Sequence, residues 1–147
     1  MVMHAGTSAA ATVSQTVQTM SGGGYLNQLL FVLRSADFTL TTDQAMTKVF
    51  TGTNWKATTI TAVRKTGGYG VACLGGFYTA ASKAGNAIVA STQTWAGLSG
   101  AGKIADATLA AVLGTDAQSS ASCYLSLSTG NTGALTADCF VFGVILD

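Results

Sequence analysis

The 147-residue chain has the length of one domain with one core, and charged residues make up only 9% of it, against about a quarter in most proteins. A formal net charge of +1 from scattered bases excludes the electrostatic footprint of a nucleic-acid-binding protein, and a hydrophobic fraction of 48% argues against disorder. No apolar run approaches the roughly 20 residues of a membrane-spanning helix, and the first 21 residues lack the basic and apolar stretches of a secretory signal peptide.

The chain is expected to begin with an N-terminal arm, residues 1–24, ahead of a single domain in residues 25–147. The arm is small and uncharged apart from one histidine, and it ends in three glycines that would form a flexible joint. Val13, Val17 and Met20 share one face of a possible helix, although an extended arm fits equally well. We expect these three side chains to contact a neighbouring subunit, with a frayed terminus as the alternative.

From residue 25 onward apolar side chains recur at every second position, which predicts half-buried antiparallel strands. This alternation runs through residues 37–42, 58–64 and 123–129, and further strands are expected at 45–50, 69–79 and 87–91. Residues 104–113 fit either a helix or a strand, with a slight preference for a strand. Since glycine-rich turns separate many short segments, the expected fold is all-β: a sandwich, a jelly roll or a barrel.

Two segments, 29–33 and 139–146, are apolar on both faces. Such strands are either central in a sandwich or packed against another subunit. A chain with so few charges cannot cover a free monomer with the usual charged surface, so an assembly subunit is favoured over a monomeric β-protein. The residues expected at a subunit interface are Leu29, Phe31, Leu33, Phe140, Phe142 and Val144.

No constellation of residues for catalysis or metal binding is recognisable. The one histidine, His4, lies in the arm, where a preorganised general base is not expected. Cys73, Cys123 and Cys139 lack the CxxC spacing of a zinc site and are expected to be buried, reduced thiols. All six acids are aspartates, best explained as turn caps. We therefore expect a protein that is not an enzyme and has no cofactor or metal.

The aromatic residues beside loops permit two interpretations. These residues are Trp55, Trp95, Tyr25, Tyr69 and Tyr78. They could stack on sugars, or they could anchor loops and subunit interfaces. The second interpretation is favoured.

Two stretches carry a resemblance to a known group of proteins. The Gly-Gly-Phe-Tyr-Thr run at 75–79, continuing to residue 89, and the Thr-Ala-Asp-Cys-Phe-Val-Phe-Gly run at 136–143 resemble strands of small virion proteins of tailed bacteriophages. The resemblance covers residues 26 to the end and does not extend to the arm. It implies a jelly-roll-like antiparallel β-sandwich that serves as a head decoration (cement) protein or a tail-associated subunit. Such a protein is usually a homotrimer, is located in the virion and binds the major capsid protein. The arm, with Val13, Val17 and Met20, would then contact the neighbouring subunit or the capsid. A receptor- or glycan-binding tail module and a small coat protein are the alternatives.

Overall fold

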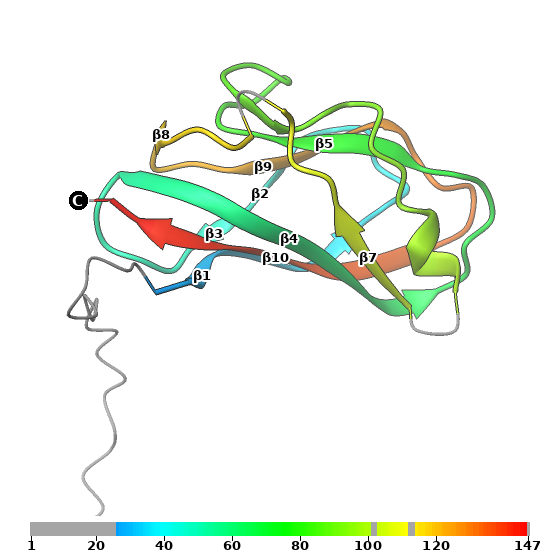
Figure 1. Ribbon diagram of the computed structural model, residues 1–147. Coiled ribbons are helices and arrows are strands. Elements are labelled where there is room, and N and C mark those ends of the chain that lie inside the picture. Colours follow the sequence, from blue (N-terminus) through cyan, green and yellow to red (C-terminus); the bar gives the residue numbers. More distant parts are fainter. Residues whose placement is uncertain (1–25, 101–102, 112–113, 147) are drawn as a thin grey trace, which may run out of the picture.

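The computed structural model describes residues 26–100, 103–111 and 114–146, which fold into two antiparallel β-sheets stacked face to face (Figure 1). The predicted all-β sandwich is thereby confirmed. The N-terminal arm, with Val13, Val17 and Met20, lies outside the described residues.

Within the described residues one sheet has six strands and the other has four. The six-stranded sheet runs in the order β3 (Thr47–Lys48), β1 (Gln28–Asp37), β10 (Leu135–Ile145), β4 (Asn54–Gly67) and β7 (Ile104–Ala107), and β8 (Gln118–Ser119) also pairs with β4. The four-stranded sheet has the order β2 (Gln44–Ala45), β9 (Tyr124–Thr129), β5 (Leu74–Tyr78) and β6 (Ala87–Val89). A single 3-10 turn, η1 (Ala96–Ser99), precedes β7.

The strand pairs are nested from the ends of the domain toward its middle. The first strand β1 pairs with the last strand β10, β2 pairs with β9, β4 with β7, and β5 with β6. The pairs β10–β4 and β9–β5 then join these strand pairs into the two sheets. This nesting of antiparallel pairs across two sheets is the jelly-roll topology.

Strand β10 shows why the sheets stack. Its burial alternates strictly along eleven residues, and every second side chain is buried between the sheets. The inward positions of β10 are Leu135, Ala137, Cys139, Val141, Gly143 and Ile145. Because side chains of a strand point alternately to opposite faces, the residues between them face away from the core.

Aromatic rings fill the two ends of the interior. Near the end of β10, Phe31 meets Trp55 edge-to-face with ring centroids 4.9 Å apart. Near its start, Trp95 contacts Phe38 at 5.7 Å and Phe77 at 5.8 Å in the same geometry. All five rings are completely buried, so they anchor the two sheets to each other.

The strand predicted over residues 37–42 is wrong, because β1 ends at Asp37 and the chain turns there. The carboxylate of Asp37 accepts hydrogen bonds from the amide (2.8 Å) and the hydroxyl (2.7 Å) of Thr39. An aspartate that caps its own turn in this way competes with strand pairing. Phe38 is buried as its place in the alternation suggested, although it lies in the turn.

Two other predicted strands are divided between the sheets. Residues 45–50 hold the end of β2 and all of β3, which belong to different sheets, and the buried Met46 lies at the crossing. In the ambiguous segment 104–113, β7 is a strand, and the chain then crosses to the other sheet. There Leu109 bridges to Val89, and the Ala110 amide donates to the Ile88 carbonyl at 2.8 Å.

Candidate interaction surface

The side of the six-stranded sheet that points away from the core is apolar along its middle. We call the following side chains the outer face, since direct cross-strand pairing places them together: Leu29, Val32, Thr59, Thr61, Val63, Ile104, Phe140, Phe142 and Val144. Antiparallel sheets commonly carry polar residues on the side that faces water. Here that side offers phenylalanine, branched aliphatic residues and threonine.

Two phenylalanines form the centre of the outer face. Phe140 and Phe142 lie two positions apart on β10, with ring centroids 6.4 Å apart and planes inclined by 30°. On β1, Val32 is directly opposite Phe140 and Leu29 is directly opposite Phe142. All four side chains are only half-buried, so the centre of the patch is open to a partner. At its β7 edge Ile104 is 51% exposed.

A charged cluster closes one end of the outer face. The guanidinium of Arg34 lies 4.9 Å from the centre of the Phe140 ring and forms a 2.9 Å ion pair with Asp138. The other carboxylate oxygen of Asp138 accepts the Ser35 amide at 2.7 Å, and the Ser35 hydroxyl accepts a hydrogen bond from the Lys65 amine at 2.7 Å. The Ser35 amide, followed by Arg34, holds the pKa of Asp138 below its ordinary value.

Four of the six residues predicted at a subunit interface lie together on this face: Leu29, Phe140, Phe142 and Val144. Phe31 is instead completely buried in the core, and Leu33 lies on the inner side, opposite Cys139. The reason is a β-bulge between Leu29 and Phe31, which shifts the alternation along β1. The same shift brings Val32 to the outer face, and sequence alternation alone does not find it.

The two tryptophans anchor loops from inside. Both side chains are completely buried. The indole N–H of Trp55 donates to the Ser120 carbonyl at 2.7 Å, and that of Trp95 donates to the Gly75 carbonyl at 3.2 Å. Tyr78 is buried as well. These three rings therefore offer no surface on which a sugar could stack.

The three cysteines are free, buried thiols. Burial raises the pKa of Cys73, Cys123 and Cys139 above the ordinary thiol value, which keeps them protonated and unreactive. Among the described residues no group of three or more histidine, cysteine or acidic side chains is placed to hold a metal ion.

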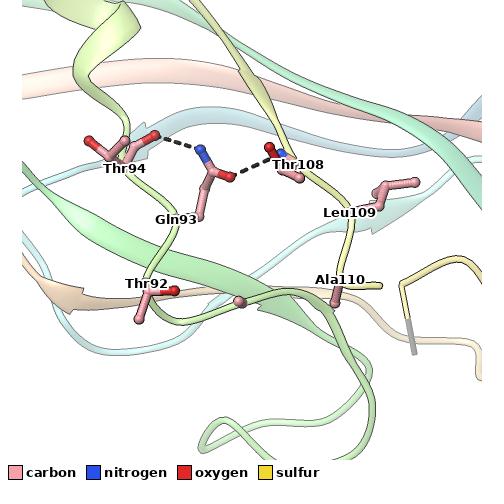
Figure 2. A pocket seen from close by; sticks show the side chains of 7 residues that line it. Thr92, Gln93, Thr94, Thr108, Leu109 and Ala110 are labelled. Carbon is pink, nitrogen blue, oxygen red and sulfur yellow. Dashed lines mark hydrogen bonds between the residues drawn. The ribbon is translucent and has the colours of Figure 1, made fainter. Parts of the chain in front are cut away.

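A hollow of about 340 Å³ lies between the loop after β6 and the segment after β7 (Figure 2). Gln93 stands at its centre, but its amide is already used inside the protein. The side-chain nitrogen donates to the Thr94 carbonyl at 2.6 Å, and the side-chain oxygen accepts the Thr108 amide at 2.9 Å. The lining of the hollow is uncharged.

Over the described ranges no helix is long and apolar enough to cross a membrane. Comparison of the chain with protein-family models, with curated proteins and with solved structures found no match.

Proposed function

We propose that this protein is a structural subunit of a bacteriophage virion, a decoration protein that binds the outside of the capsid and bridges capsid subunits. The observation that carries the proposal is the outer face, an apolar sheet surface on a chain with few charges. Monomeric soluble proteins rarely expose contiguous apolar patches larger than a few hundred Å². A surface of this kind is best explained by coverage in an assembly.

The sequences of two strands support the part of the proposal that names a phage virion protein. The Gly-Gly-Phe-Tyr part of the first run lies in β5, with Thr79 directly after it, and the Thr-Ala-Asp-Cys-Phe-Val-Phe-Gly run lies in β10. Both runs resemble strands of small phage virion proteins. Jelly rolls occur in viral capsid proteins and also in lectin domains and cupins, so the fold alone does not decide between these functions. The buried tryptophans give no support to a sugar-binding module.

A decoration protein of this kind would act through many repeated contacts. Each contact with the capsid can be modest, because simultaneous engagement of linked subunits raises the overall avidity by about 10²–10⁴. A subunit that bridges two capsid proteins also couples their movements, and the shell then resists the pressure of packaged DNA. No bond is made or broken in this mechanism.

The test is to add the purified full chain to particles of the phage that encodes it, prepared without this protein, and to measure co-sedimentation. Saturable binding, with capsids that withstand a higher temperature, is the expected result. If shells cannot form at all without the chain, it is a coat protein rather than a decoration. If it neither binds particles nor occurs in purified virions, the proposal is wrong.

A further inference from the structure

We propose that the outer face of the six-stranded sheet binds the outer face of a second copy of this chain, so that two sandwiches pack back to back about a two-fold axis. The inference rests on the proposed function in one respect, that the chain acts in an assembly, and it names the partner of this surface. The solution experiment below does not depend on the virion.

Strand β10 is apolar toward both of its faces. Its inward residues are apolar because they form the core, but its outward residues Phe140, Phe142 and Val144 are apolar as well. A strand buried on both faces has this pattern. The inner face is covered by the other sheet of the same chain, and within the described residues nothing covers the outer one.

The outer face has nearly the size of a small protein–protein interface. Strands β1, β10 and β4 have ten, eleven and fourteen residues. Ten residues extend about 34 Å, three long strands spaced about 4.8 Å apart span about 14 Å, and the four residues of β7 add a strip of about 14 Å by 5 Å, which gives a face of roughly 550 Å². A standard protein–protein interface buries about 800 Å² on each partner. One sheet face is therefore close to the lower end of the standard range, which is about 600 Å² per partner.

Charge is distributed over the outer face as it is over a protein–protein interface. The centre of the outer face holds aromatic, aliphatic and threonine side chains. Charged groups lie around its rim: the Arg34–Asp138 ion pair with Lys65 at one end and the exposed Lys56, opposite Val144, at the other. On the β7 edge, the carboxylate of Asp106 accepts a hydrogen bond from the Thr61 hydroxyl at 2.6 Å. An apolar centre with a polar rim is the usual anatomy of an interface between proteins.

The symmetry follows from the use of one patch. When the same patch serves both partners, the two copies are related by a two-fold axis. A three-fold arrangement, which the resemblance to phage proteins implies, needs two different patches on each copy. A second apolar face of comparable extent is not present on the described residues: the exposed large apolar side chains off this face, such as Leu40 and Val71, are single.

The first test measures the mass of the full chain by sedimentation at micromolar concentration, with and without Phe142→Thr. Threonine favours strands and already occurs at Thr59 beside this position, so the fold should persist. The wild type should sediment as a dimer, at twice 14.8 kDa. Phe142→Thr should weaken dimerisation by about tenfold or more, as loss of a central aromatic residue does. The matched control is Val71→Thr, at an exposed site off the outer face, which should remain dimeric.

The second test identifies the occupant of the face. Since the native thiols are buried, Thr59→Cys places one accessible thiol on the outer face of the full chain. A short bis-maleimide should join two such chains through this position, whereas Thr132→Cys, exposed in a loop off the face, should not be joined. In a Met20→Cys/Thr59→Cys chain, a cross-link between positions 20 and 59 in place of 59 to 59 would make the N-terminal arm the occupant and overturn the proposal.

Other outcomes are equally decisive. A monomeric wild type, a trimer, or a dimer unaffected by Phe142→Thr would each overturn the two-fold interface. A chain that stays monomeric in solution but binds particles would refute this interface and leave the decoration function standing. A dimer that is weakened by Phe142→Thr but never binds particles would support this interface and refute the decoration function.

Discussion

At the scale of single residues, the side chain of Asn131 joins two loops through hydrogen bonds to their backbone. Its side-chain oxygen accepts the amides of Gly70 (2.9 Å) and Val71 (3.1 Å). Its side-chain nitrogen donates to the carbonyls of Gly68 (2.9 Å) and Gly133 (2.6 Å). Asn131 is buried, so these bonds hold the loop before β5 against the loop before β10. The strand expected to begin at residue 69 starts at Leu74, because backbone groups of residues 68–71 are hydrogen-bonded to the Asn131 side chain instead of to a neighbouring strand.

Asn131→Ala should lower the free energy of unfolding by about 1–3 kcal/mol, because it leaves buried amides and carbonyls without partners. Urea or thermal unfolding of the variant measures the loss. Thr132→Ala, exposed one residue further on, is the matched control and should change the stability little. Equal stabilities for the two variants would show that Asn131 does not tie the loops.

Asp138 should make stability depend on acid. The Ser35 amide and the Arg34 guanidinium lower its pKa in the folded state, so its stabilising effect is present above the unfolded-state pKa of about 3.9 and is lost as the pH falls through the lower folded-state value. Asp138→Asn keeps the shape but removes the charge. The Tm difference between wild type and Asp138→Asn, measured on dilute protein, should therefore shrink from about pH 6 to about pH 2. A difference independent of pH would contradict this assignment.

At the scale of elements, period-two alternation locates most of the strands, but it does not predict where a bulge changes the face on which a side chain lies. It correctly divides β10 into one set with Phe140, Phe142 and Val144 and another with Cys139, Val141 and Ile145. It fails in β1, where bulges put both Leu30 and Phe31 in the core. A bulge depends on pairing with a strand about a hundred residues away, and no local pattern encodes that pairing.

The two faces of the sheet should respond differently to truncation. Phe31→Ala should cost about 3–5 kcal/mol, since Phe31 is fully buried beside Trp55. Phe142→Ala should cost less, about 1–2 kcal/mol in dilute protein, because this ring is only half-buried in one chain. Chemical unfolding of both variants gives the comparison. A larger loss for Phe142→Ala would mean that the ring is buried within its own chain.

At the scale of the whole molecule, the sandwich was predictable from composition, alternation and turns, and the nesting of its strand pairs was not. Nesting is set by long-range contacts such as β1 with β10, which join the two ends of the domain. For the same reason the sequence could not separate interface residues from core residues. Phe31 and Phe142 are equally hydrophobic, and only the fold assigns the first to the core and the second to the surface.

The thiols report whether this single core opens as a unit. Cys73, Cys123 and Cys139 are buried at different places in the sandwich and burial raises their pKa values. All three should stay unreactive toward a disulfide reagent in native buffer at neutral pH and react together once denaturant unfolds the chain. Rapid labelling of one thiol under native conditions would reveal a part of the core that opens by itself.

The central claim, that the outer face is covered by a partner, is tested most directly by hydroxyl-radical footprinting of the full chain over a range of concentrations. Oxidation of Phe140 and Phe142 should fall as the concentration rises through the association range. Tyr124, half-buried on β9 of the other sheet, should be oxidised equally throughout. Oxidation of Phe140 and Phe142 that does not change with concentration, while Tyr124 becomes protected, would contradict the account.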